Sequence, residues 1–287
     1  MARFLITRIL GNDVPMTHGD NQTYVNLQFT LENEPAFEST DKLYVLNSII
    51  DGAKKARLID LLDSYGAKYV DIPFSDFPPI DDATASFVES NMTERNITRE
   101  IIIKWHHAIY PFAIMLNLNK ARNFCVDYGQ QHGYEWTFVM DSNTFFTNTM
   151  FSNIVRNIAA DTDMIVIPLK RLKDNVLILT AEIDDVPVDE PQLAFRNTVS
   201  HRFNEALPYG VMNKAELLNA IGIKGRWNIW PGLRYLNMEQ RRFTDVKHQV
   251  LSSVARLHRF SEKENDNFLF RMFGVYQMVK QYHDNLV

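Results

Sequence analysis

The chain has 287 residues, of which 46% are hydrophobic and 23% are charged, an ordinary composition for a globular protein. Its formal net charge of −5 argues against indiscriminate nucleic-acid binding, and no segment approaches the roughly 20 apolar residues that a membrane-spanning helix requires. The single cysteine, Cys125, excludes an intrachain disulfide and a cysteine-based zinc cluster. It favours a reducing, cytoplasmic setting, which for a viral protein would be the host cytoplasm.

The first seventy or so residues alternate between strand and helix patterns. Strands are expected at three short apolar runs that end at turn residues or at proline, 3–10, 42–48 and 68–73. Amphipathic helices are expected between them, at 21–33 and 53–65, and Gly66 is a typical residue after a helix. This order predicts an α/β fold, in which a mostly parallel central sheet is flanked by helices.

The rest of the chain is less regular. A proline-rich loop is expected at 73–96, and a helical stretch at 97–131 that Pro111 breaks in two. Further strands are expected at 136–143 and, as a pair, at 164–169 and 175–180, before an acidic loop at 181–190. Further helices are expected at 147–160, 214–221 and 262–285. Because no repeat or flexible linker interrupts the pattern, we interpret the chain as one domain.

Charge is distributed unevenly along the chain. Residues 196–259 contain eleven Lys/Arg and four acidic residues, so this segment carries +7 and the rest of the chain −12. Such a basic region indicates a face that meets a nucleotide diphosphate or a longer polyanion, unless its charges are scattered over the surface. Aromatic residues alternate with arginines at 225–235. Such a surface can stack on sugar rings or bases and bind phosphates. The alternative is that the tryptophans lie in the core and the arginines cap helices. The candidate acceptor-binding residues are Arg226, Trp227, Trp230 and Arg234.

The clearest candidate site lies at the end of the strand at 136–143. Parallel α/β sheets bind ligands outside the carboxyl ends of their strands, and this strand delivers Asp141 and Asn143 there. Carboxylate and amide oxygens suit a hard cation such as Mg²⁺ or Mn²⁺, with phosphate oxygens completing its coordination. An Asx turn that only ends the strand is the alternative.

Two segments together resemble the GT-A glycosyltransferases. The segment Leu-Asn-Leu-Asn-Lys-Ala-Arg-Asn at 116–123 precedes the strand Trp-Thr-Phe-Val-Met-Asp-Ser-Asn at 136–143. In that superfamily a helix with an Ala-Arg-Asn segment precedes an Asp-x-Asp metal motif. The resemblance covers roughly residues 1–150 and implies a single GT-A (Rossmann-like) domain. Its first half, 1–150, would bind the donor, and its second half, 151–287, the acceptor. Asn143 departs from the motif, so the site has one negative charge fewer, and basic side chains could replace the metal.

The resemblance implies transfer of a sugar from a nucleotide-diphosphate donor, of the UDP type, to an acceptor hydroxyl. Mn²⁺ or Mg²⁺ would bind at Asp141 and Asn143, with a histidine, His258 or His201, as a third ligand. The residues expected to contact the donor follow the first strands or lie on the preceding helix, and they are Arg8, Asn12, Asp13, Asn47, Asp51, Arg122 and Asp141. An inverting enzyme also needs a carboxylate base, for which Asp189 and Glu190 are the candidates. A retaining enzyme needs no such base.

The acceptor is left open between two classes. One is a saccharide, and the other, which the basic segment suggests, is DNA with hydroxymethylated pyrimidines, as in bacteriophage DNA-modifying glycosyltransferases. Two other functions also fit the pattern. A nucleotidyltransferase can share this topology, although 11–13 has few glycines for a phosphate-binding loop. A non-catalytic nucleotide-sugar-binding protein would explain Asn143 in place of an acid.

Overall fold

A single mixed sheet organises the chain in the computed structural model, which describes residues 3–91, 98–180, 188–211, 213–225, 239–258 and 268–285. The strand order is β3-β2-β1-β4-β7-β6-β9-β5, and β8 pairs with β6. The strands are β1 (Phe4–Leu10), β2 (Thr40–Asn47), β3 (Tyr69–Ile72), β4 (Trp136–Asp141), β5 (Thr144–Phe145), β6 (Met164–Arg171), β7 (Val188–Arg196), β8 (His248–Val250) and β9 (Val254–Arg256).

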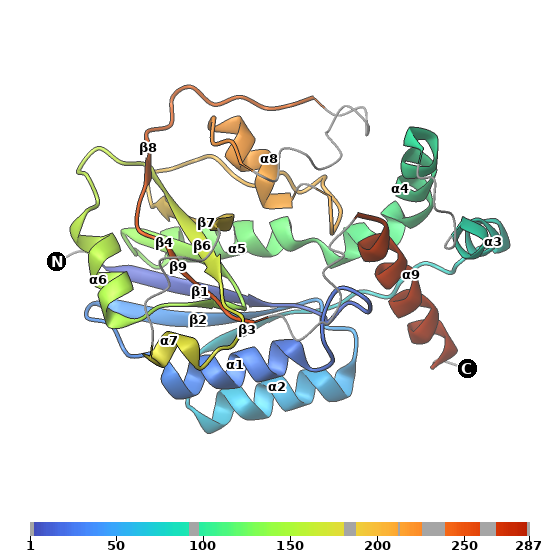
Figure 1. Cartoon of the computed structure of the whole chain (residues 1–287), viewed down its shortest axis with the longest axis horizontal. Helices are drawn as coiled ribbons and strands as arrows, with labels where there is room; N and C mark the ends of the chain where they lie inside the picture. The colour runs from blue at the N-terminus through green and yellow to red at the C-terminus, as the bar shows by residue number, and fades with distance from the viewer. Residues whose placement is uncertain are drawn as a thin grey trace.

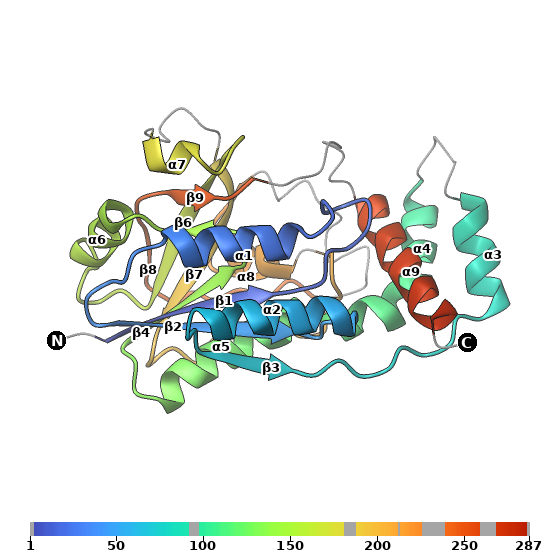
Figure 2. The ribbon, with the colours of Figure 1, turned by 90° about the horizontal axis from the view of Figure 1, so that it is seen from below.

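Helices cover the sheet on both faces (Figure 1). They are α1 (Gln22–Asn33), α2 (Gly52–Ser64), α3 (Asp82–Asn91), α4 (Arg99–Ala113), α5 (Leu118–Gln131), α6 (Asn148–Arg156), α7 (Leu177–Thr180), α8 (Asn213–Ala220) and α9 (Phe268–Asp284), and a 3₁₀ turn spans Ile114–Leu116. Helices α1 and α2 lie on the face opposite α5, and α3, α4 and α9 gather at one end of the sheet (Figures 1 and 2). Among the described residues, no helix has both the length and the hydrophobicity to cross a membrane.

Side-chain alternation along β1 explains the two packed faces. Leu5 and Ile9 belong to the apolar cluster under α5 and α8, whereas Leu10 belongs to the cluster under α1 and α2. Successive strand residues point to opposite faces, so neighbours in β1 reach different layers. The same alternation decides on which face of the sheet each polar side chain of β1 lies.

The α/β prediction is confirmed, but the sheet is mixed and not mostly parallel throughout. Strands β3, β2, β1 and β4 are parallel to one another, as the sequence pattern predicts. Strand β7 is antiparallel to both β4 and β6, and β5 is antiparallel to β9. The carboxyl ends of β1 and β4 meet at one edge, where Ile9 pairs with Asp141.

Three predicted elements were wrong. Strand β6 pairs with β7, β8 and β9. The apolar run that we expected as its partner strand at 175–180 contains α7, because a short apolar run does not distinguish a strand from a helix. The expected loop at 73–96 contains α3, which follows Asp81, whose carboxylate accepts a hydrogen bond from Thr84 N–H. Pro111 lies within α4, and the break falls at Asn117, whose side chain caps α5.

A glycine fixes how closely α5 approaches β4. A Cβ atom on Gly129 would stand 1.8 Å from Thr137 Oγ1 and 3.0 Å from Thr137 Cβ, so rotation of the threonine cannot remove the clash. We expect Gly129→Ala to lower the free energy of unfolding by roughly 1–3 kcal/mol through overpacking. Gly52→Ala is the matched control, since a Cβ there meets nothing within 4 Å. Urea unfolding of both variants checks this, and equal stability of the two would contradict the close contact.

Candidate functional site

A cavity of about 150 Å³ lies at the carboxyl ends of β1, β2 and β4. Among the described residues that line it, five are basic and two are acidic, so its charge favours an anionic ligand. The basic residues are Arg122, Arg171, Lys214, Arg256 and Arg271, and the acidic ones are Asp141 and Glu190. They come from both halves of the chain.

Asp141 is the centre of a charge cluster in this cavity. Its Oδ1 accepts a hydrogen bond from Arg122 Nη2 at 3.0 Å. Its Oδ2 accepts hydrogen bonds from Gln192 Nε2 at 2.9 Å and from Lys214 Nζ at 3.0 Å. Burial alone would raise the pKa of the Asp141 carboxyl, but Lys214, Arg122 and Arg256 outweigh it and hold the pKa well below its ordinary value. Asp141 is therefore a carboxylate at neutral pH.

Lys214, in the first turn of α8, is the functional candidate that the sequence analysis missed. Its side chain is 2% exposed, and Nζ lies 3.8 Å from Glu190 Oε2 as well as 3.0 Å from Asp141 Oδ2. A lysine buried this deeply needs anionic partners, and these two acids supply them. No motif marks Lys214, and the only sequence signal was the net charge of its segment.

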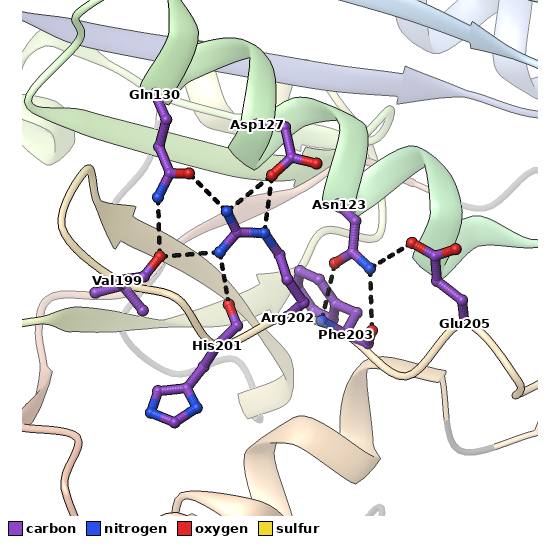
Figure 3. Close-up of polar contacts among 8 residues, drawn as sticks. All are labelled: Asn123, Asp127, Gln130, Val199, His201, Arg202, Phe203 and Glu205. Atoms are coloured by element: carbon purple, nitrogen blue, oxygen red, sulfur yellow. Dashed lines mark hydrogen bonds and ion pairs between the residues drawn. The ribbon is translucent and has the colours of Figure 1, made fainter.

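The segment before Lys214 is fastened to α5 by polar side chains (Figure 3). Asn123 accepts from Phe203 N–H at 2.9 Å and donates to Phe203 C=O at 3.0 Å. One residue earlier, Arg202 donates to Asp127 Oδ1 at 2.8 and 2.9 Å and to Gln130 Oε1 at 2.6 Å. These bonds join the segment around Arg202 and Phe203 to α5.

Arg122 is fixed by the same helix. Its Nη1 donates to Asn119 Oδ1 at 2.9 Å, one helical turn away, and its guanidinium lies 5.6 Å from the centre of the Phe203 ring. The residue is 4% exposed. Because its position is set by neighbours on two elements, its charge is held beside Asp141 without a ligand.

Two buried oxygen acceptors near Asp141 have no hydrogen-bond partner among the described residues. They are Asn143 Oδ1 and Gln192 Oε1. Asn143 lines the cavity, and its backbone C=O accepts from Leu257 N–H at 2.7 Å. Buried acceptors are normally paired, so Asn143 Oδ1 is suited to accept a hydrogen bond from a ligand.

Arg8 does not reach the cavity, contrary to its expected role in binding the donor. Its side chain is 1% exposed and forms an ion pair with Glu34, while Nε donates to Thr144 C=O at 3.1 Å. The reason is the alternation of side chains along β1, which points Arg8 toward α1 and places its neighbour Ile9 in the lining of the cavity. Arg8 is thus a core residue.

The other residues of the first loops tie those loops together and line the site. Asn12 Nδ2 donates to Ser48 C=O at 2.8 Å, and Asn12 Oδ1 accepts from Ile50 N–H at 2.9 Å, joining the loops after β1 and β2. Asp13 accepts from Thr23 N–H and Oγ1 at 3.0 and 2.7 Å, and burial raises its pKa. Asn12 and Asn47 line the cavity beside Asp141.

A second cavity, of about 450 Å³, adjoins the first and shares Gly11, Asn12 and Thr23 with it. Asp13 and Asp51 line it, and Asp51 also caps α2 by accepting from Ala53 N–H at 2.9 Å. The two cavities give the carboxyl edge of the sheet a large and a small compartment side by side.

Of the two expected catalytic acids, Glu190 lines the cavity, and its side chain is 15% exposed. The backbone of Asp189 pairs with Leu169 in the sheet, but its side chain is outside the described part of the structure. The expected acceptor-binding residues Arg226, Trp227, Trp230 and Arg234 also lie outside it.

Neither histidine expected as a metal ligand lines the cavity around Asp141. The backbone N–H of His258 donates to Asn175 Oδ1 at 2.6 Å. His201 Nε2 lies 3.3 Å from Asp245 Oδ2, and its ring packs on Phe243. Within the residues that the structure describes, no three His, Cys, Asp or Glu side chains are placed to hold one metal ion.

Several basic residues of the segment at 196–259 are matched by acids. Arg196 pairs with Glu135, Arg202 with Asp127, Arg241 with Glu216, and Lys247 with Asp161. Arg196, Arg202, Arg241 and Lys247 therefore form no continuous basic face, which supports the alternative of scattered charges. Lys214 and Arg256 differ, because they line the cavity.

No protein-family model matches the sequence, and no curated protein matches it. Among solved structures, a mannosyltransferase from Pyrobaculum calidifontis in complex with GDP-Man and Mn²⁺ is 10% identical, with a TM-score of 0.40 over 91% of this chain and 58% of that chain. A 4-diphosphocytidyl-2C-methyl-D-erythritolsynthase from Anaerococcus prevotii is 12% identical, with a TM-score of 0.34 over 96% of each chain.

A cytidylyltransferase from Leptospira borgpetersenii is 8% identical, with a TM-score of 0.32 over 69% of this chain and 60% of that chain. This chain thus spans less than two thirds of the length of the mannosyltransferase and of the cytidylyltransferase. Structural neighbours therefore include glycosyltransferases and nucleotidyltransferases. These TM-scores are too low to indicate a shared function.

Proposed function

We propose that this chain transfers a sugar from a nucleotide-diphosphate donor to an acceptor hydroxyl, with the diphosphate bound in the cavity beside Asp141. The observation that carries the proposal is the convergence of Lys214 and Arg122 on Asp141 at the carboxyl ends of parallel strands. Two buried cations fixed at that edge of the sheet suit a diphosphate, and the carboxyl edge of a parallel sheet is where such folds bind ligands.

The transfer step needs a group that stabilises the leaving diphosphate. When the bond between the anomeric carbon and the diphosphate oxygen breaks, its electron pair stays on that oxygen. Lys214 and Arg122 would stabilise the growing negative charge by charge-assisted hydrogen bonds. In an inverting reaction the acceptor oxygen forms the new bond to the anomeric carbon, and Glu190 accepts its proton.

The larger cavity would take the nucleoside of the donor. It shares the lining residues Gly11, Asn12 and Thr23 with the Asp141 cavity, and this adjacency supports a donor that occupies both. Asp13 and Asp51 offer carboxylate oxygens to ribose hydroxyls there. A UDP-type donor is the first one to test.

The residues around Asp141 do not fit the Mn²⁺ or Mg²⁺ that the sequence led us to expect. Both carboxylate oxygens already accept hydrogen bonds, and two of the three donors are cationic. An ion on Oδ2 would stand at most about 5 Å from Lys214 Nζ, given metal–oxygen distances near 2.1 Å. At an effective dielectric constant of about 20, their repulsion is on the order of several kcal/mol. Lys214 and Arg122, and not a metal ion, therefore stabilise the diphosphate in the proposed reaction.

Replacing Glu190 tests the proposed base. We expect Glu190→Gln to lower the rate of sugar transfer roughly 10²–10⁴-fold while leaving donor affinity within a few-fold, because the amide keeps the size of the side chain but cannot accept the proton. Glu239→Gln is the matched control, since Glu239 is exposed and does not line the cavity. Transfer rates and donor binding are measured in both variants. An unchanged rate in Glu190→Gln would remove Glu190 as the base and favour a retaining reaction.

A ligand panel tests the function itself. Thermal shifts are measured with UDP-, GDP- and ADP-sugars and with nucleoside triphosphates, followed by turnover assays with saccharides and with hydroxymethylated DNA as acceptors. The proposal predicts stabilisation by a sugar nucleotide and its turnover with one acceptor class. Stabilisation by a triphosphate, with release of pyrophosphate, would indicate a nucleotidyltransferase instead. Binding of a sugar nucleotide without turnover would indicate a binding protein.

A further inference from the structure

We infer that Lys214 and Arg122 take the place of a divalent cation, so that the chain binds its diphosphate ligand without a metal. The inference rests on the proposed function only for the identity of the ligand that carries the diphosphate. The preference for an anion comes from the cavity itself, because five basic and two acidic residues line it.

The first support is the state of Asp141. A carboxylate has about four lone pairs, and three of them are already engaged here, one on Oδ1 by Arg122 and two on Oδ2 by Lys214 and Gln192. Both cationic partners are nearly excluded from solvent, with side chains 5% and 2% exposed. Lys214 and Arg122 therefore already supply positive charge at the position beside Asp141 that a metal ion would occupy.

The second support is the donor set around that position. A site for a hard divalent ion gathers carboxylate oxygens, whereas the second motif position here is the neutral Asn143. Its buried Oδ1 has no hydrogen-bond partner among the described residues and can accept from a ligand hydroxyl group. Lys214 and Arg122 instead offer N–H donors, which bind phosphate oxygens directly.

The third support is that both cations are held in place without ligand. Arg122 is braced by Asn119, and the segment leading to Lys214 is fastened to α5 through Asn123 and Arg202 (Figure 3). A lysine ammonium group has three donors, and Asp141 takes one of them. Cations fixed in advance need no reorganisation when a diphosphate arrives, which is the condition for strong electrostatic stabilisation.

Calorimetry with inorganic pyrophosphate tests this inference on the whole chain. We expect pyrophosphate to bind in EDTA with an affinity within about threefold of that in Mn²⁺. Lys214→Ala should weaken binding in EDTA by about 10- to 100-fold, as expected for a lost charge-assisted hydrogen bond. Lys224→Ala is the matched control, because Lys224 is exposed and does not line the cavity. Binding that requires Mn²⁺ would overturn the inference.

A second variant keeps the test valid if Lys214→Ala fails to fold. Asn143→Asp restores the acidic pair of a metal motif without removing a cation. If the chain works without metal, the added negative charge should weaken pyrophosphate binding in EDTA, and Mn²⁺ should not strengthen it beyond the wild-type value. If Asn143→Asp and the wild type instead both bind pyrophosphate tightly only with Mn²⁺, the site is a metal site and the inference fails.

The outcomes separate this inference from the proposed function. Metal-free binding of pyrophosphate without binding of any sugar nucleotide would keep the inference and remove the function. Turnover of a sugar nucleotide that EDTA abolishes would keep the function and remove the inference. Failure of pyrophosphate to bind in either condition would remove the inference.

Discussion

Asp141→Ala is expected to lower the rate of sugar transfer by at least about 100-fold and the free energy of unfolding by roughly 3–5 kcal/mol. The alanine leaves Arg122 buried without its carboxylate partner and Lys214 with only Glu190, 3.8 Å away, and removing an anionic partner from a buried cation is costly. The two cations would repel each other and move away from the positions that the diphosphate needs. Initial transfer rates and urea unfolding curves measure the two effects.

Asp161→Ala is the matched control for this variant. Asp161 also pairs with a lysine, Lys247 at 3.2 Å, but both side chains are about 70% exposed, so the pair contributes little to stability. Wild-type transfer and stability in Asp141→Ala would contradict the role given to Asp141.

The pH dependence of stability should follow the same pairing. In the folded chain burial acts to raise the pKa of the Asp141 carboxyl, but Lys214 and Arg122 outweigh burial and lower it. The stabilisation is therefore present above the ordinary carboxyl pKa of 3.8 and is lost as the pH falls through the lower, native value. Between pH 5 and 8, the titration of Asp141 should contribute nothing to stability or to activity.

Glu34→Ala is the second variant for which we expect a large effect, and here the effect is on stability. Glu34 is 0% exposed and is shared by Arg8, by Lys42 at 2.8 Å and by Phe146 N–H at 2.9 Å. Its removal leaves Arg8 as an unpaired charge in the core, at a cost of roughly 3–5 kcal/mol. The melting temperature should fall by roughly 10 °C.

The control for Glu34→Ala is Glu32→Ala, since Glu32 lies two residues earlier, in the last turn of α1, and is exposed. It should change the melting temperature by no more than about 2 °C. Equal melting temperatures for the two variants would show that Arg8 has another partner and that the assigned ion pair is unimportant.

The parallel half of the fold could be predicted because local patterns specify it. Strand and helix alternate with short connections from β1 to β3, and each amphipathic helix buries one face on the strands beside it. The same logic placed Asp141 at the ligand edge. The antiparallel pairing of β7 with β4 and β6 could not be predicted, because it joins residues far apart in the chain and no local pattern specifies such partners.

The site itself was only partly predictable. Arg122, Asp141, Asn143 and Glu190 follow from strand ends, from the resemblance and from the search for a base, and the structure places them around one cavity. Lys214 lies on a short helix without a motif, so its contact with Asp141 appears only in three dimensions. The prediction that Arg8 contacts the donor was wrong, because the sequence predicts the strand but not which of its side chains face the cavity, and Arg8 pairs with Glu34 instead.

A crystal structure of the chain with a bound UDP-sugar, grown in EDTA, would show directly whether Lys214 and Arg122 bind the diphosphate. We expect density for the diphosphate in the Asp141 cavity, with a phosphate oxygen within about 3 Å of Lys214 Nζ and a second near Arg122. A diphosphate bound elsewhere on the chain, with Lys214 still confined to Asp141 and Glu190, would contradict it.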